Sequence, residues 1–156
     1  MEFPDFPPEE ELPENVVHFH FEDVTFDIPH EEILTAWLCS VGEQENVPFY
    51  EVNYIFCSDE YLRKVNVEYL DHDYYTDIIT FPYEDGVVHG DMFISSDRVA
   101  ENAQTNGVSF FQELCRVMVH GVLHMAGYGD KTPEEEQTMR VKEDVYLKLL
   151  ESRLSA

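Results

Sequence analysis

Residues 109–130 read SFFQELCRVMVHGVLHMAGYGD and predict the central helix of the protein. Ser109, followed three residues later by Gln112, is the capping-box pattern that begins a helix. Gly127 is well placed to end this helix, because glycine readily adopts the left-handed conformation common just past a helix end. Between them, apolar residues recur at helical spacing over a broad face and predict a buried helix: Phe110, Leu114, Val117, Met118, Gly121 and Met125.

Two histidines lie on this predicted helix at a spacing that suits a shared metal ion. His120 and His124 are four residues apart, so their side chains project from one face, one above the other. Asp130 follows six residues later, and the turn at Gly127 can bring its carboxylate back toward them. Two histidines and a carboxylate form a known catalytic zinc set with a fourth position left for water. Histidine pairs at this spacing also arise by chance on exposed or core faces, so the turn and Asp130 carry the prediction of a zinc site.

The segments around this helix alternate between strand and helix patterns. Period-2 alternation predicts strands at residues 16–21, 24–28, 50–57, 77–81 and 87–95. Helical spacing and caps predict further helices at 29–42, after Ser58, from Ser96 and from Thr132 to about Leu150. Because no regular βαβ repeat emerges, the pattern predicts an α+β fold. We expect a single domain with a small mixed sheet of about four or five strands, about five helices and a metal site at a cleft.

Length and composition set bounds on the class of protein. A chain of 156 residues, 44% of them apolar, predicts one domain with a sizeable core. Residues 1–15 are rich in proline and acids and are expected to form a loose arm before a metal-binding domain at 16–156. No run approaches a membrane span and no signal peptide is evident, so a cytoplasmic location without membrane partners is expected. Three scattered cysteines are expected to be small buried hydrophobes rather than a finger-type zinc site.

The charge balance bears on possible partners. The formal net charge is −24, with only 9 lysines and arginines. Since affinity for phosphate backbones comes mainly from these cations, the balance argues against a general nucleic-acid binder, and no DNA partner is expected. Two routes to nucleic acid remain open: a protein partner with a basic surface, or a metal site with a local basic patch.

A three-ligand zinc site would support hydrolysis of a phosphodiester, a peptide or an amide, because the ion lowers the pKa of its bound water. Metalloproteases of the HExxH type place a glutamate after the first histidine as the general base. Gly121 stands at that position here, so a protease would lack its base. Glycine inside a helix costs about 1 kcal/mol relative to alanine, which indicates that another backbone or a substrate passes close to Gly121.

The motif around the histidines resembles the signature of the YbeY family, the single-domain rRNA maturation factors of bacteria. That signature reads HGxLH, two further residues, then GYDH, and it is matched here at residues 120, 121, 123, 124, 127 and 128. A second family segment is matched by Asn66, Tyr69 and the TDIITFP stretch at 76–82, and a third by Gly90 and Asp91 before an apolar strand. The three segments follow the family's order over residues 60–130.

The resemblance implies an α+β fold with one metal ion, usually zinc, at the mouth of a cleft. It also implies a single-strand-specific endoribonuclease that matures the 3′ end of small-subunit (16S) rRNA and takes part in ribosome quality control. The implied partners are rRNA and the small ribosomal subunit or its proteins.

One departure from the family pattern concerns the metal. The family's third histidine aligns with Asp130, and a carboxylate can still complete a zinc site with two histidines. We expect a less acidified metal-bound water than with three histidines, and a site more hospitable to Mn²⁺ or Fe²⁺. Non-haem iron oxygenases also use two histidines and one carboxylate, which leaves that class as a minor alternative.

A second departure concerns RNA contacts. Leu70 stands where the family usually has an arginine, a natural clamp for phosphate. Its loss and the acidic balance weaken the expectation of direct RNA cleavage. Tyr69, Tyr74 and Tyr75 surround this position and either stack on bases or pack in the core.

Three other acids are candidates for roles in or near the site. Asp77 begins a strand and either orients a ligand histidine or acts as a base, or it is a strand-entry residue. Glu113 lies seven residues before His120 on the same face and either contacts a neighbour or ligates the ion. Asp91 is expected to be a structural acid.

The remaining histidines are expected to be mainly structural or exposed. His72 and His89 are replacement ligands if Asp130 does not ligate, and surface residues otherwise. His18 and His20 alternate on one face of a strand. The sequence identifies no general base. It leaves open two further functions: a ribosome-assembly factor that binds through protein contacts with a structural metal, and a metallohydrolase of a small substrate.

Overall fold

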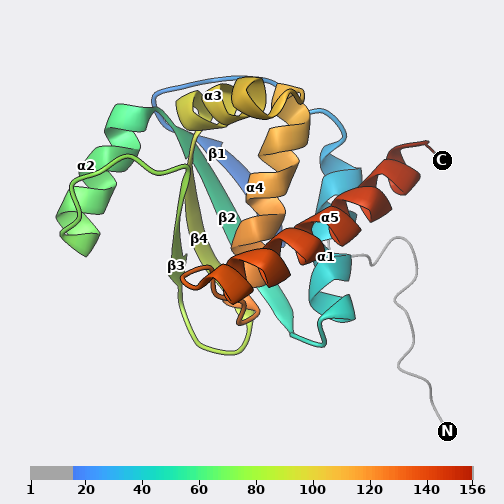
Figure 1. Ribbon diagram of the computed structural model, residues 1–156. Coiled ribbons are helices and arrows are strands. Elements are labelled where there is room, and N and C mark those ends of the chain that lie inside the picture. The colour runs from blue at the N-terminus through green and yellow to red at the C-terminus, as the bar shows by residue number, and fades with distance from the viewer. Residues whose placement is uncertain (1–15, 156) are drawn as a thin grey trace, which may run out of the picture.

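The computed structural model describes residues 16–155, so the arm expected at residues 1–15 lies outside the described part. Within that part the chain forms four strands and five helices, which confirms the predicted α+β class (Figure 1). In chain order they are β1 (Val17–Phe21), α1 (Glu31–Gln44), β2 (Phe49–Cys57), α2 (Asp59–Leu70), β3 (Ile78–Pro82), β4 (Val88–Ser95), α3 (Ser96–Asn106), α4 (Phe110–Met125) and α5 (Pro133–Ser155).

The four strands form one mixed sheet in the order β1-β2-β4-β3. β1 pairs with β2, and β2 with β4, in parallel, whereas β3 runs antiparallel to β4. In this register Val17 lies opposite Val52, and Tyr54 lies opposite Met92. Alternate residues of neighbouring strands therefore project together onto one face.

The two faces of the sheet are covered unequally. The main core joins one face, through Tyr54, Phe56 and Met92, to buried side chains of α1, α4 and α5. On the opposite face α2 makes a smaller core, in which Leu62 meets Ile79. Figure 1 shows α2 standing apart from the other helices, with α5 crossing in front of α4. The site described below lies where these two helices meet.

The helix that carries both histidines forms as its sequence predicts. Ser109 Oγ accepts a hydrogen bond from the Gln112 backbone N–H at 3.0 Å, and Gln112 Oε1 accepts one from the Ser109 N–H at 2.9 Å. This reciprocal capping box satisfies donors that the first helical turn leaves free. Gly127 follows the helix with φ of 113°, which confirms its role at the end.

Gly121 is close-packed, but not against the group that we expected. A Cβ added there would lie 2.3 Å from Met92 Sδ and 3.0 Å from Ile78 Cδ1. The expectation of a passing backbone or substrate is therefore wrong: side chains of the sheet fill the space beside the glycine. The absence of a side chain lets α4 approach β4 closely.

The strand predicted at residues 24–28 is also wrong, because this segment is an irregular connection between β1 and α1. Its apolar side chains are nevertheless directed toward the core. The ring of Phe26 meets Phe56 and Phe110 edge-on at centroid distances of 5.1 and 5.2 Å. Alternating burial thus arises here from packing over the core without strand pairing.

The burial expected of the cysteines is confirmed for two of the three. Cys57 and Cys115 are buried and Cys39 is half-buried, all as free thiols. Across residues 16–155, none of the helices combines the length and the apolar character needed to cross a membrane.

Candidate metal centre

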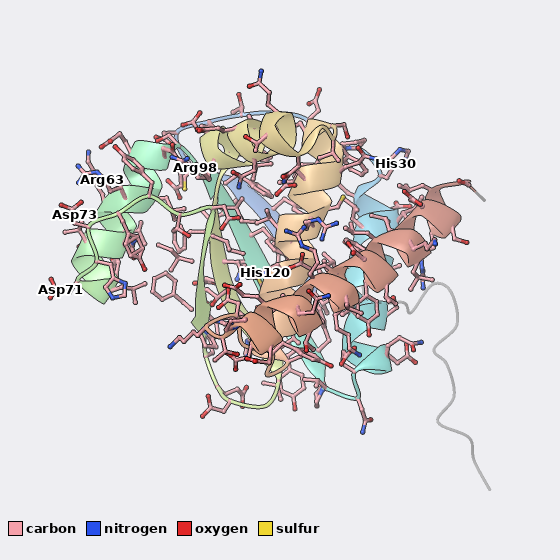
Figure 2. All side chains as sticks on the ribbon, viewed as in Figure 1. His30, Arg63, Asp71, Asp73, Arg98 and His120 are labelled. Carbon is pink, nitrogen blue, oxygen red and sulfur yellow. The ribbon has the colours of Figure 1, made fainter. Side chains whose placement is uncertain are left out.

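A cleft of about 540 Å³ opens between α4 and α5 and holds part of the predicted metal site. His120 lines it from α4, Asp130 from the loop after α4, and Asp77 from the residue just before β3. Figure 2 shows His120 beside the place where α5 crosses α4. The structure therefore brings together residues from three separate parts of the chain, as a shared site requires.

The two histidines and the aspartate lie close to one another. The rings of His120 and His124 are nearly parallel, at 14°, with centroids 6.1 Å apart. Asp130 Oδ2 lies 3.4 Å from His120 Nε2. His124 is exposed at the edge of this group and donates its Nδ1–H to the carbonyl of Tyr128 at 2.9 Å. Its Nε2 is the nitrogen left free to act as a ligand.

Glu143 of α5 orients His120, also through a hydrogen bond from the Nδ1–H of the ring. Its carboxylate is 5% exposed and accepts the Nδ1–H of His120 at 2.7 Å. The other oxygen accepts from Arg116 Nη1 at 2.8 Å. Metal-binding histidines usually donate their second ring N–H to a carboxylate or a carbonyl, which orients the ring and sets its tautomer. Both histidines have that arrangement here.

Charge around His120 favours its cationic form. Burial acts to lower the pKa of His120, but the carboxylates of Glu143, Asp77 and Asp130 outweigh it and raise the pKa above its ordinary value. A group of acids that stabilises a proton on imidazole also stabilises a metal cation beside it. The electrostatics of the cleft thus suit a bound cation.

The donor set fits a metal ion in its chemistry. Neutral imidazole nitrogens and a carboxylate are the ligands that zinc and the first-row divalent metals take. Within residues 16–155, no three His, Cys, Asp or Glu side chains lie close enough together in their present conformations to ligate one ion. Ligation by His120, His124 and Asp130 therefore requires these side chains to close together further.

The loop that follows α4 is held in place by Glu45 at the end of α1. The carbonyl of Tyr128 accepts the hydrogen bond from His124, and the hydroxyl of Tyr128 donates a hydrogen bond to Glu45 Oε1 at 2.6 Å. Tyr146 and Lys142 of α5 also donate to this carboxylate. Burial acts to raise the pKa of Glu45, but the hydrogen bonds from Tyr128, Tyr146 and Lys142 outweigh it and lower the pKa. The anion thus links three elements around the site.

Asp77 lies in the same cleft, half-buried, just before β3. Burial raises the pKa of its carboxyl, an effect that nearby His120 partly opposes. Its backbone carbonyl accepts the Ser95 N–H at 2.9 Å, so the residue also has the structural role expected at a strand entry. Both interpretations of Asp77 therefore remain compatible with its position.

Glu113 also lines the cleft, but at a distance from the histidines. It is buried on α4, and Asn106 Nδ2 lies 3.5 Å from its Oε1. Seven residues separate it from His120, which is about 10 Å along a helix axis. The structure therefore favours contact with a neighbour over ligation of the same ion.

The remaining candidates lie away from this cleft. His18 and His20 project from the outer face of β1, where they contact Glu51 at 3.0 Å and Asn53 at 3.1 Å. Asp91 accepts hydrogen bonds from Asn53 and Tyr83 on the same face, as expected of a structural acid.

His89 contacts Glu84 at 3.2 Å, and His72 contacts the Tyr74 hydroxyl at 3.2 Å after α2. Both histidines are therefore surface or structural residues. Tyr69, Tyr74 and Tyr75 are 65%, 53% and 50% exposed, so the interpretation that they pack in the core is wrong. Stacking on bases stays a prediction.

Two residues of the site were missed at the level of sequence: Glu143 and Arg116. A signal for Glu143 was present, because Met139, Glu143, Tyr146 and Leu150 lie at helical spacing and are all buried. An acid inside such an apolar stripe must find a partner on the element that it packs against. That partner is the pair formed by His120 and Arg116.

Comparisons with known proteins show the family of the chain. A model of the family described as endoribonuclease YbeY matches residues 17–151. Among proteins named endoribonuclease YbeY, the one from Amoebophilus asiaticus is 44% identical over 138 residues, 87% of this chain and 94% of its own length. The one from Cytophaga hutchinsonii is 46% identical over 140 residues, covering 88% and 98%. The one from Flavobacterium johnsoniae is 48% identical over 130 residues, covering 83% and 93%.

A solved structure supports the fold. The solution structure of TM1509 from Thermotoga maritima matches with a TM-score of 0.61 over 88% of this chain and 91% of that chain, at 24% sequence identity. Together with the family match and the identities above, these likenesses agree with the motifs that first suggested the relationship. The chain belongs to the endoribonuclease YbeY family.

Proposed function

We propose that this protein is a metal-dependent, single-strand-specific endoribonuclease that matures the 3′ end of 16S rRNA and takes part in ribosome quality control. The observation that carries the proposal is the cleft in which His120, oriented by Glu143, lies beside Asp130 and one turn before His124. The relatives bear the name endoribonuclease, and this cleft holds the groups that such chemistry needs.

His120, His124 and Asp130 would hold the ion, and we propose zinc, with Mn²⁺ or Fe²⁺ accommodated because Asp130 supplies a hard oxygen ligand. When bound in such a set, the metal supplies a water of lowered pKa and polarises a phosphoryl oxygen. Glu143 and the Tyr128 carbonyl hold the two Nδ1–H groups, which directs each Nε2 to the ligand role.

Proton transfer needs a group whose pKa lies nearer neutrality than that of an ordinary carboxyl. Asp77 meets this requirement, since burial raises its pKa and it shares the cleft with His120. We propose that an Asp77 carboxylate oxygen accepts the proton of the attacking water. This role supplies the general base that the sequence did not identify.

The proposed substrate and partners are rRNA and the small ribosomal subunit or its proteins, in the cytoplasm. One observation favours the alternative of an assembly factor that acts through protein contacts. Leu70 is 41% exposed at the position of the family arginine, so the surface there presents an uncharged side chain. That loss weakens phosphate contacts and leaves the metal a structural role.

The test is to map the 3′ end of 16S rRNA in cells depleted of this protein. Depleted cells are complemented with the wild type, with His124→Ala, or with His72→Ala as a histidine variant outside the cleft. We expect extended 3′ ends that are rescued by the wild type and by His72→Ala, but not by His124→Ala.

Rescue by His124→Ala would instead support the assembly factor, because the metal site would then be dispensable. Normal 3′ ends upon depletion would refute a role in rRNA maturation.

A further inference from the structure

A second hollow, of about 920 Å³, adjoins the metal cleft and extends along α4 and α5 toward the C-terminal end of α5. Asn106, Glu113, Arg116 and Arg140 line both hollows, so the two lie side by side. We infer that single-stranded RNA leaves the metal cleft along this second hollow, where Arg140 and Lys148 contact its phosphates. The inference rests on the proposed function, since it names the path of the substrate of that same site.

The first support comes from the distribution of cations. The sequence has nine lysines and arginines, all within residues 16–155. In that part of the chain, four of the nine form ion pairs with carboxylates: Arg63, Arg98, Arg116 and Lys142. Figure 2 shows Arg63 and Asp73 at α2, well apart from His120. Of the five others, Arg140 and Lys148 both line the second hollow and are exposed.

Their position suits a polyanion: within residues 16–155 neither cation forms an ion pair with a carboxylate, so neither need give up such a partner to bind phosphate. Arg140 lines both hollows and therefore lies at their junction, whereas Lys148 lines only the second. Lys148 is eight residues further along α5, about 12 Å along the axis and about 80° around it, and both side chains line the same hollow. The two cations would thus contact separate phosphates of one strand.

The acids on this path are partly neutralised. Asp144 is held by Arg116 Nη2 at 2.7 Å. Glu113 is only 5% exposed, and burial raises the pKa of its carboxyl. Glu151 remains an exposed acid toward the far end of the hollow. On a chain with a net charge of −24, the stretch between Arg140 and Lys148 is therefore a favourable place for phosphates.

The lining combines polar and apolar side chains, which suits a strand that is not base-paired. Asn106, Ser109 and Gln112 lie along the hollow with Phe111, which offers an aromatic face. Amide and hydroxyl groups can bind exposed base edges, and aromatic rings can stack on unpaired bases. The hollow thus offers single-stranded RNA contacts beyond its phosphates.

The inference is tested by binding of fluorescently labelled oligouridylate to the full chain across a series of salt concentrations. All proteins carry His124→Ala, so that the RNA is not cleaved. Arg140→Gln and Lys148→Gln are compared with Arg153→Gln, which removes the same charge from α5 outside both hollows. We expect each test variant to bind about five- to tenfold more weakly at low salt, with a salt slope smaller by about 0.7. The control with Arg153→Gln should bind with the same affinity and salt slope as the parent protein, which carries His124→Ala alone.

Equal affinities and slopes for all variants would overturn the path. If the wild type also cleaves RNA in a separate assay, the proposed function stands and only the path fails. If the parent protein does not bind the RNA and the wild type does not cleave it, the proposed function fails and the path fails with it.

Discussion

Replacing Glu143 with glutamine removes the negative charge that His120 and Arg116 share while keeping nearly the same shape. In the wild type one carboxylate oxygen accepts from His120 at 2.7 Å and the other from Arg116 at 2.8 Å. The glutamine carbonyl can accept only one of these hydrogen bonds, and its NH₂ group would face a second donor. The variant therefore disturbs either the orientation of His120 or the contact with Arg116.

The magnitude follows from what each partner retains. Arg116 keeps Asp144 at 2.7 Å, so its charge is not left unpaired. Removing one member of a buried ion pair costs about 3–5 kcal/mol when the other is left uncompensated. With Asp144 in place, we expect the free energy of unfolding of the metal-free protein to fall by about 1.5–3 kcal/mol. Loss of a carboxylate that orients a ligand histidine typically lowers metal affinity about 10- to 100-fold.

The assay is a titration of metal-free protein with Zn²⁺ against a competing chelator, combined with urea unfolding. Glu151→Gln, which removes an exposed acid from the same helix, is the matched control. We expect weaker zinc binding in Glu143→Gln and unchanged binding in the control. Zinc affinity within twofold of the wild type would refute the reasoning that Glu143 orients His120 for metal binding.

Asp130→His should retain zinc but lose affinity for Mn²⁺ relative to zinc, because a hard oxygen ligand is replaced by imidazole; competition between the two metals measures this, and an unchanged ratio would count against ligation by Asp130. Glu45→Gln should lower the free energy of unfolding by about 1–3 kcal/mol at pH 7. Since the folded-state pKa of Glu45 is lowered, that stability is present above its unfolded-state pKa and is lost as pH falls through the folded-state value. Urea unfolding should therefore show the difference shrinking below about pH 4, and a constant difference would contradict it. Gly121→Ala should lower the midpoint of thermal unfolding, because the alanine Cβ would lie 2.3 Å from Met92 Sδ. Overpacking of this kind costs about 1–3 kcal/mol, whereas the higher helix propensity of alanine contributes about 1 kcal/mol. A raised midpoint would show that the Met92 side chain moves aside at little cost.

Features that depend on local chemistry could be predicted from the sequence. The capping box at Ser109 and the helix end near Gly127 follow from short-range hydrogen bonding and backbone freedom. The spacing of His120 and His124 likewise fixes their common face on any helix. These local rules place two of the three predicted ligands before the fold is known.

Features that depend on crossing elements could not be predicted as well. The alternation at residues 24–28 reports burial, and burial alone cannot distinguish a paired strand from a connection that packs over the core. Glu143 contacts His120 only because α5 crosses α4, a non-local arrangement. Its place among the buried residues of α5 indicates that it needs a partner, but not which one.

Whether a metal held by His120, His124 and Asp130 drives RNA cleavage can be measured with purified protein. Cleavage of a single-stranded RNA that carries the 16S 3′ region is measured for the wild type and for His124→Ala, after chelation and after zinc is restored. We predict that the wild type loses activity on chelation and regains it with zinc, while folded His124→Ala stays at background throughout. Cleavage by His124→Ala at the wild-type rate, with the same response to chelation and zinc, would contradict the account.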